Sequence, residues 1–466
     1  MLGMLVSLLA FFPGWMSVDS LTQYMDAKSD VYHDWHPVLM AWWWRILDGV
    51  YPGPALMLVQ NLLLYWLGFG LLAIASSRWI GVYAGLLPLV GFWPGILFPL
   101  GEIWKDICFA TSIFFAWALL INVYSQQRTL YFIETTGIFI LSIFAVGVKP
   151  NGLVVLPFLM WFWTSLERWC RTGVIKRILL TVVLTLTFVL VSIAIVPKEK
   201  IVKQYNFQYS QVYDLLAITV KSNRNVFPEY IRSKMGDAKE FGKLYSPGAN
   251  TAFSAVFLGL APTSPGLATT KPLELADLQR CWIDAISSHP FVYLQHRLNT
   301  FAALLRLDSA RPAGAVAWAG IVSNPFGFTF TKNILSKALT ATLLIPFMYA
   351  PWVYLLALLA SVYVLARQKR HKTLLFCFSG SSIAFALPHI FVVPSNEYRY
   401  LYYSNLCAVT LTFFGAVAVL RPTIERRPLR NRPQCNKEQA PIVHDNDSPV
   451  GSKTTSGRSL RRCLGQ

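Results

Sequence analysis

The first polar segment of the chain is dense in side chains that can do acid–base chemistry. Eighteen residues of it, 19–36, hold four aspartates and two histidines: Asp19, Asp26, Asp30, Asp34, His33 and His36. Only 14% of the whole chain is charged, so this density stands out. A carboxylate can accept the proton of an attacking hydroxyl, with a histidine supporting it. Composition also leaves open a solvated loop whose aromatic residues rest at lipid headgroups.

Asp19 is the main candidate for a general base. It follows Trp15 by four residues, which places its carboxylate just outside the hydrocarbon core of a membrane. We expect Asp26 and Asp30, deeper in the segment, to contact solvent and to be replaceable. His36 is expected to support the site.

A second acidic pair lies further along, where an apolar run begins. Glu102 and Asp106 are four residues apart, so on one helix they would share a face. Two like charges at that spacing repel unless Lys105, a metal ion or a shared proton intervenes. Alternatively, acidic side chains in the first turn of a helix can interact favourably with the positive end of the helix dipole. Such carboxylates can hold a divalent cation, but their spacing specifies no metal.

Several cations border the apolar runs on the same predicted side: Arg45, Lys105, Lys149 and Arg399. Cations at a headgroup boundary suit a phosphate group, although each can also snorkel toward anionic lipid. Arg399 is the main candidate for a phosphate clamp because it lies in a short loop beside Tyr398, which we expect to bind substrate as well.

Long apolar runs must position these residues. The chain has 466 residues, of which 55% are hydrophobic. Runs of about 18 apolar residues are typical of membrane-spanning helices. The sequence therefore predicts an all-α polytopic membrane protein with about ten transmembrane helices: 2–15, 55–75, 79–100, 106–124, 131–148, 152–164, 177–196, 338–366, 373–393 and 401–420.

Basic segments predict the orientation of these helices. Residues 168–177, residues 367–372 and the tail are rich in Lys and Arg, as cytoplasmic loops are. The net charge of +18 therefore indicates a multi-pass protein of the cell membrane rather than a nucleic-acid-binding one. Five polar segments then share the outer face, which predicts an extracytoplasmic site: 16–54, 101–106, 149–152, 197–337 and 395–400.

The pattern divides the chain into four parts. We expect an N-terminal transmembrane module at 1–196 with its first outer loop at 16–54, and an outer subdomain of mixed helix and coil at 197–337. A C-terminal transmembrane module at 338–420 precedes a disordered, basic cytoplasmic tail at 421–466. Within the subdomain, helical patterning covers 213–220 and 275–305 with a break at His289-Pro290, and the Gly/Pro-rich passage 246–272 is expected to be mobile.

Four short motifs carry a family resemblance: Asp19-Ser20, Asp34-Trp35-His36-Pro37, Lys105-Asp106 and Glu397-Tyr398-Arg399-Tyr400. Their order resembles the GT-C superfamily of polytopic glycosyltransferases, especially the protein O-mannosyltransferase-like and lipid A aminoarabinose transferase-like branches. Ser20 stands where the mannosyltransferases carry a second acid, and Val38 where they carry a second proline. These departures favour a bacterial envelope substrate over protein mannosylation.

The resemblance implies transfer of a sugar, with inversion, from a polyprenyl-phosphate-linked donor to an envelope glycan, lipid or protein. Asp19 would be the base, Asp106 and Glu102 would position the acceptor or a metal ion, and His36 would support the site. Lys105 and Arg399 would bind the phosphate.

Other functions stay open on the sequence alone. A ligase or polymerase of polyprenyl-linked glycans would rely on Arg and His in the long outer loop. A lipid-linked-sugar flippase or other transporter would usually need ionisable residues inside the spans, and none lies near the middle of a predicted span. A non-catalytic scaffold would not explain five polar segments on one side.

Overall fold

The computed structural model describes residues 2–167, 173–235, 242–248, 251–259, 266–307, 316–393 and 395–425. The chain divides into a large unit, Met1–Pro422, and a short unit, Thr423–Gln466. The large unit holds every residue of the candidate site. The predicted tail lies outside the described residues except for its first five, which continue the last helix.

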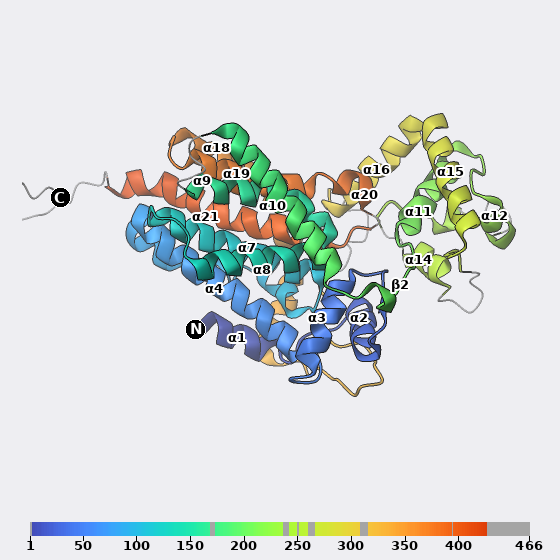
Figure 1. Ribbon diagram of the computed structural model, residues 1–466, viewed down its shortest axis with the longest axis horizontal. Coiled ribbons are helices and arrows are strands. Elements are labelled where there is room, and N and C mark those ends of the chain that lie inside the picture. Colours follow the sequence, from blue (N-terminus) through green and yellow to red (C-terminus); the bar gives the residue numbers. More distant parts are fainter. Residues whose placement is uncertain are drawn as a thin grey trace, which may run out of the picture. The chain divides into compact units, whose positions relative to one another are not determined.

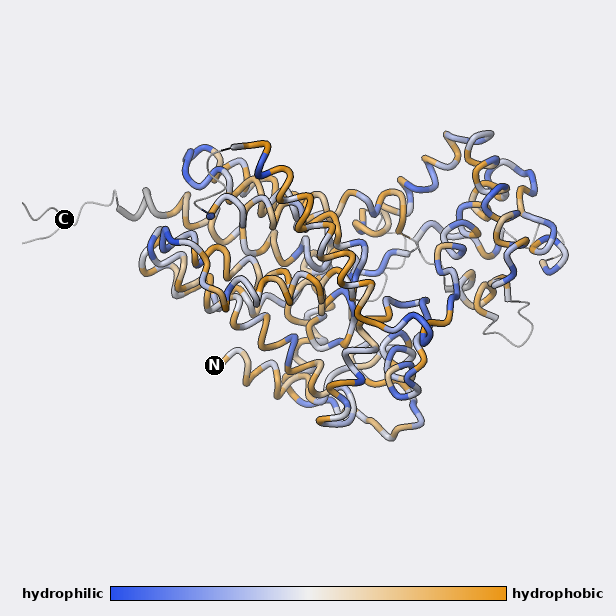
Figure 2. The backbone as a smooth tube through the Cα atoms, viewed as in Figure 1, coloured by the Kyte–Doolittle hydropathy of each residue, from blue (hydrophilic) through white to orange (hydrophobic). Residues whose placement is uncertain are grey.

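The structure is mostly helical, at 76%, which agrees with an all-α membrane protein. Five helical segments are long and apolar enough to cross a membrane: Ala55–Val90, Lys105–Ser125, Val174–Ala194, Lys372–Val392 and Tyr398–Leu420. Five shorter apolar segments accompany them: Leu2–Phe11, Phe132–Val148, Pro150–Leu166, Ile334–Leu344 and Pro351–Arg367. The hydrophobic colour in Figure 2 follows these helices, and the chain is more hydrophilic around α2 and β2.

The helices of the bundle, drawn in Figure 1, are α1 (Leu2–Phe11), α4 (Ala55–Ile80), α5 (Leu87–Val90), α6 (Pro94–Leu97), α7 (Lys105–Ser125), α8 (Phe132–Val148), α9 (Leu156–Leu166), α10 (Val174–Ala194), α17 (Ile334–Ala341), α18 (Pro351–Arg367), α19 (Lys372–Ala386), α20 (His389–Val392) and α21 (Tyr402–Glu425). Short 3-10 turns join them: η1 (Gly81–Leu86), η2 (Phe98–Gly101), η3 (Pro150–Val155), η6 (Thr342–Leu344), η7 (Pro346–Tyr349) and η8 (Tyr398–Leu401).

Two predicted spans are not single helices. Residues 79–100 form four short helical pieces, because Pro88, Pro94 and Pro99 each remove a backbone donor and prevent one continuous helix. Residues 338–366 are broken in the same way near Pro346 and Pro351. Apolar composition located these segments but did not reveal their breaks.

The first outer loop, 16–54, is not a loop but a pair of helices, α2 (Val18–Ser29) and α3 (Val38–Asp48), with the short strand β1 (Tyr32–His33) between them. Strand β1 pairs in parallel with β2 (Ile201–Val202), which follows the 3-10 turn η5 (Lys198–Lys200). The pairing joins this segment to the beginning of the predicted outer subdomain.

The described part of 203–307 contains five helices: α11 (Phe207–Ser222), α12 (Glu229–Met235), α14 (Thr251–Leu258), α15 (Pro272–Ser288) and α16 (Pro290–Leu304). They enclose an apolar core separate from that of the bundle, with Val212, Leu216 and Phe257 at its centre. The predicted break at His289-Pro290 separates α15 from α16. The passage 246–272, expected to be mobile, contains α14 and lies partly outside the described residues.

Arg78 of α4, Tyr124 and Ser125 of α7, and His371 of the basic turn 367–372 lie together at one end of the bundle. The hydroxyl of Tyr124 lies 3.0 Å from Nδ1 of His371, and Arg78 donates to Ser125 at 3.3 Å. Helix α7, which ends there, has 21 residues and so a length of about 30 Å. Its other end begins at Lys105, so the candidate site lies a full membrane thickness away from the basic turns.

Candidate active site

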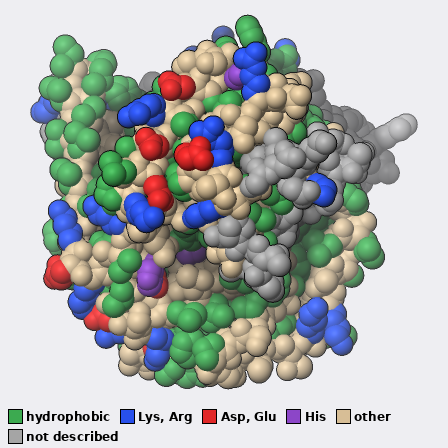
Figure 3. Space-filling view, turned by 90° about the vertical axis from the view of Figure 1, so that its right-hand side faces the viewer, with side chains coloured by type: hydrophobic (Ala, Val, Ile, Leu, Met, Phe, Trp, Pro, Cys, Tyr) green, Lys and Arg blue, Asp and Glu red, His purple; other side chains and the backbone are tan. Residues whose placement is uncertain are grey.

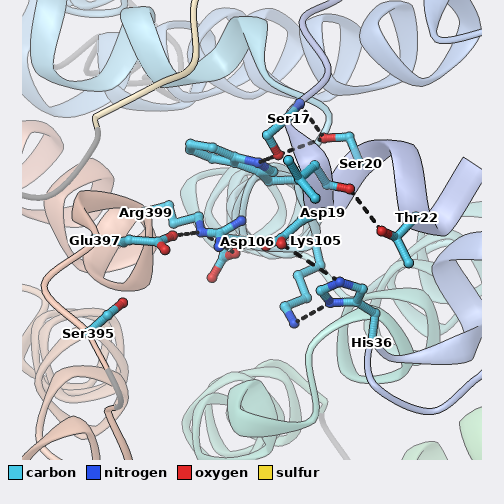
Figure 4. Close-up of polar contacts among 12 residues, drawn as sticks. Ser17, Asp19, Ser20, Thr22, His36, Lys105, Asp106, Ser395, Glu397 and Arg399 are labelled. Carbon is cyan, nitrogen blue, oxygen red and sulfur yellow. Dashed lines mark hydrogen bonds and ion pairs between the residues drawn. The ribbon is translucent and has the colours of Figure 1, made fainter. Parts of the chain in front are cut away.

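Asp19 lies in the first turn of α2. The start of this helix is fixed by Ser17, whose backbone N–H donates to Ser20 Oγ at 3.2 Å, and by Trp104, whose indole N–H donates to Ser17 Oγ at 2.7 Å. The Asp19 side chain is 31% exposed, so its carboxylate is held by the fold and still reaches solvent. Figure 4 shows it facing residues from three other parts of the chain.

Arg399, from η8, is the main partner of Asp19. Its Nη2 lies 2.6 Å from Asp19 Oδ2, and its Nε lies 2.5 Å from Glu397 Oε2 and 4.0 Å from Asp106 Oδ2. The guanidinium also stacks over the Trp104 ring, 4.5 Å from its centroid. A planar guanidinium suits this arrangement, because it can donate in several directions and stack at once.

Asp106 and Lys149 form a second, deeply buried ion pair. Asp106 is in the first turn of α7, Lys149 follows the end of α8, and their side chains are 1% and 6% exposed. A buried charge is costly unless it is paired, so each group neutralises the other. Lys149 therefore lies at the site as predicted, with its charge taken by Asp106.

His36 and Lys105 form the third contact. The Lys105 ammonium lies 3.2 Å from His36 Nδ1, and His36 Nε2 lies 3.9 Å from Asp19 Oδ1. Burial, reinforced by the nearby Lys105 charge, lowers the pKa of His36 to about 3. The imidazole is therefore neutral at pH 7, accepts from Lys105 through Nδ1, and carries its proton on Nε2 toward Asp19.

The two partly exposed carboxyls differ in how readily they ionise. Burial favours the neutral form of Asp19, but the charge of Arg399, helped by that of Lys105, outweighs it and holds the pKa well below its usual range. For Glu397 burial prevails over Arg399, and the pKa is raised. Asp19 therefore ionises more readily than Glu397, and its carboxylate is open to an incoming group.

Glu102 and Asp106 do not share a helix face, so that prediction is wrong. Helix α7 begins only at Lys105, and Glu102 is extended. Its Oε1 accepts from the backbone N–H groups of Trp318 and Ala319, the latter at 3.0 Å. Full burial raises the pKa of Glu102 to about 8, although these two donors favour its ionised form. Glu102 is thus protonated at pH 7 and holds the outer segment in place.

Tyr398 does not join the cluster, although it is adjacent to Arg399. Its side chain is fully buried in the bundle core, and its hydroxyl donates to the Gly95 carbonyl at 2.9 Å. Successive residues of the η8 turn point in different directions, so one holds the bundle and the next reaches the site.

The sequence led us to expect that Asp26 and Asp30 mainly contact solvent. In the structure both are instead paired with other side chains. Asp26 is buried and accepts from the His33 backbone N–H at 2.9 Å, with His33 Nδ1 at 2.7 Å. Asp30 is paired with Lys200 at 2.5 Å and with Arg45 at 3.4 Å. These contacts fix β1 against β2 and leave Arg45 outside the cluster.

A divalent metal ion does not fit the residues gathered here. In the described ranges no group of three or more His, Cys, Asp or Glu side chains comes together to hold one. The carboxylates of Asp19 and Asp106 are instead compensated by Arg399 and Lys149.

Sequence reasoning overlooked two members of the site, Glu397 and Trp104. Both are next to residues that it selected, and Glu397 belongs to a motif that it used. The face viewed in Figure 3 carries intermixed acidic and basic side chains rather than a large patch of one sign. No family model, no curated protein and no solved structure matches this chain.

Proposed function

We propose that the protein is an integral membrane glycosyltransferase of the GT-C type. It transfers a sugar from a polyprenyl-phosphate donor to an envelope acceptor on the outer face of the membrane. The observation that carries this proposal is Asp19: an ionised, partly exposed carboxylate held 2.6 Å from Arg399, beside Lys105, at the end of the membrane-length helices.

Asp19 acts as the general base. Its Oδ2 is bound to Arg399, so Oδ1 is the oxygen left to meet the acceptor hydroxyl. The acceptor oxygen bonds to the anomeric carbon, the bond from that carbon to the phosphate oxygen breaks, and the hydroxyl proton passes to Oδ1. A carboxylate with a lowered pKa is a weak base, so it takes the proton late, once the new bond has made the hydroxyl acidic.

Lys105 binds the donor phosphate. Arg399 and Lys149 are already paired with carboxylates, whereas no carboxylate oxygen of the described residues lies within 4 Å of the Lys105 ammonium. Its partner, His36, is neutral, so the Lys105 ammonium is not taken up in an ion pair and can stabilise the departing phosphate. Arg399, the main candidate from sequence, instead holds Asp19 in its ionised form.

A glycan ligase or polymerase is the alternative. Such enzymes were expected to use Arg and His of the outer segment, and the pair Arg297 and His296 there is fully buried against Asp214. This pair is not presented to a glycan, so the alternative depends on exposed side chains such as Arg280.

The test uses the full-length protein in membrane vesicles. A strain lacking the protein should accumulate at least one polyprenyl-phosphate-linked sugar, identified by mass spectrometry. The purified protein should consume that lipid and release polyprenyl phosphate. Neither accumulation in the strain nor turnover by the protein, with the wild-type chain present in the membrane, would refute the proposal.

A further inference from the structure

A second polar cluster lies inside the helices of 207–304, away from the candidate site. Asp214 on α11 is 0% exposed, and Arg297 on α16 is 1% exposed, with Nη2 2.6 Å from Asp214 Oδ2. The Trp282 indole N–H donates to the same oxygen at 2.9 Å, and His296 Nε2 lies 3.3 Å from Asp214 Oδ1. The cluster is closed to solvent and touches no residue of the candidate site.

Stability alone does not account for these charges. The surrounding core is apolar, with Leu216, Leu278 and Phe257 among its members. Replacing a buried ion pair by apolar residues of similar volume is often neutral or stabilising, so such a pair is weak evidence for a contribution to stability. The geometry of the Arg297 guanidinium gives a different account.

Arg297 also holds a residue of the membrane bundle. Its Nη1 donates to the Val393 carbonyl at 3.1 Å, beyond the end of α20. Asp214 accepts from the other guanidinium nitrogen and so fixes its orientation. The guanidinium therefore connects the core of the outer helices to the chain just before segment 395–400.

The far end of that segment lies in an apolar cluster that the same helix helps to form. Leu304 and Leu305, at the end of α16, belong to this small cluster together with Val393 and Leu401. Both ends of the segment that carries Glu397 and Arg399 are thus part of the cluster at the end of α16. Because segment 395–400 is held at both ends, the Arg399 side chain within it is kept in position, and its guanidinium lies 2.6 Å from Asp19.

We infer that Asp214 and Arg297 are positioning residues, which hold segment 395–400 in the geometry that Arg399 needs to reach Asp19. Neither residue touches the reacting groups. The inference rests on the proposed function only for its effect on catalysis, since the tether itself is a property of the fold.

The main test replaces the pair by apolar residues, in the double variant Asp214→Leu/Arg297→Met. This change removes both charges together and leaves no buried charge unpaired. Hydrogen exchange is measured on the full-length protein in membrane vesicles. The amides of 397–401 should exchange at least ~10-fold faster than in the wild type, while those of 107–121 in α7 stay unchanged.

Trp282→Phe is the matched control, because it removes a hydrogen bond from the same cluster but leaves the Arg297–Val393 contact intact. It should leave exchange at 397–401 unchanged. Unchanged exchange at 397–401 in a folded double variant would overturn the inference, and so would an equal effect of Trp282→Phe. If the double variant does not fold, Arg297→Lys decides in its place: one ammonium cannot keep both contacts, so exchange at 397–401 should still rise.

Activity provides the second readout. With the donor lipid, the double variant should lower kcat at least ~10-fold and change KM by less than ~3-fold, because the donor phosphate is bound by Lys105 elsewhere. A change in KM alone would contradict positioning. A wild-type protein without transferase activity would refute the proposed function, and hydrogen exchange would still decide on the tether.

Discussion

The guanidinium of Arg399 lies 2.6 Å from the Asp19 carboxylate, although 380 residues separate them in the chain. Asp19 lies in the first turn of α2, the first helix after α1, and Arg399 lies in η8, which directly precedes the last helix of the bundle. Their contact therefore joins the beginning and the end of the helical bundle at the candidate site. Arg399 lowers the pKa of Asp19, so replacing either residue should have a distinct and measurable effect.

Asp19→Asn should lower the transfer rate by on the order of 10²–10⁴, because the amide keeps the size of the side chain but cannot accept a proton. The measurement is turnover of the donor lipid at equal abundance in the membrane. Asp30→Asn is the matched control from the same segment: its ion pairs with Lys200 and Arg45 are partly exposed, so activity should stay within about twofold. Near-normal activity of Asp19→Asn would make Asp106 the next candidate for the base.

Arg399→Lys should lose at least ~10-fold in kcat/KM, since a single ammonium cannot bind Asp19 and Glu397 while stacking on Trp104. Arg399→Met should also change the pH profile. Burial raises the pKa of Asp19 and Arg399 is the strongest influence that lowers it, so without Arg399 this pKa rises. The acidic limb of kcat/KM should therefore move to higher pH. An acidic limb at the wild-type position would show that Arg399 does not control the ionisation of Asp19.

Lys105→Met should raise KM for the donor at least ~10-fold, because the phosphate loses a cation that forms no ion pair with a carboxylate of the described residues. Lys200→Met, at an ammonium already paired with Asp30 and 40% exposed, serves as control and should leave KM for the donor unchanged. Equal effects of the two substitutions would point to a general loss of positive charge rather than to a phosphate site.

Glu102 should make stability depend on pH. Burial raises its pKa to about 8 in the folded protein, against an ordinary value of 4.5, so the unfolded chain releases this proton first. Unfolding thereby becomes easier as pH rises from about 4.5 to about 8, and the effect levels off above that range. The free energy of unfolding should fall by a few kcal/mol, at about 1.4 kcal/mol per unit of pKa difference.

Glu102→Gln tests this prediction. The amide oxygen can still accept from the backbone N–H groups of Trp318 and Ala319, but the side chain no longer titrates. Thermal unfolding in detergent should show a smaller fall between pH 5 and pH 8 than in the wild type. The same fall in both proteins would assign the pH dependence to another group.

The orientation of the site can be tested by labelling single cysteines with a membrane-impermeant reagent in intact cells. Ala268→Cys, in the outer segment, should react, and Gln368→Cys, in the turn between α18 and α19, should react only after permeabilisation. Both positions are exposed. The background replaces Cys281, which is only partly buried, and the three cysteines outside the described residues, Cys170, Cys435 and Cys463. The reverse labelling pattern would place the site in the cytoplasm.

The sequence was sufficient to select most of the residues that the fold brings together. Asp19, His36, Lys105, Asp106, Lys149 and Arg399 all come together in the structure, from four of the five polar segments that were predicted to meet. The fifth segment reaches Glu102 through the backbone of Trp318 and Ala319. Polar groups that border apolar runs have few places to go in a membrane protein, so composition and order constrain them strongly.

Composition also determined that the protein is helical and membrane-like, but not how each apolar run is built. The run 79–100 is as hydrophobic as a spanning helix and still breaks at its prolines. A proline has no backbone N–H, so carbonyl groups near it lack a helical donor and accept hydrogen bonds from other parts of the chain. Tyr65 and Tyr398, far apart in the chain, donate to the carbonyls of Gly91 and Gly95. No local pattern contains these partners.

Only the tertiary structure decided where each side chain points and which charges are free. Tyr398 and Arg399 are neighbours with the same predicted role, yet one is buried in the bundle and the other binds Asp19. Lys105 and Lys149 carry the same charge, yet the contact of Lys149 with Asp106 leaves Lys105 as the one available for phosphate among these two. Sequence determines the charge that a residue type can carry, whereas its partners and burial, which arise from packing across hundreds of residues, determine what that charge can do.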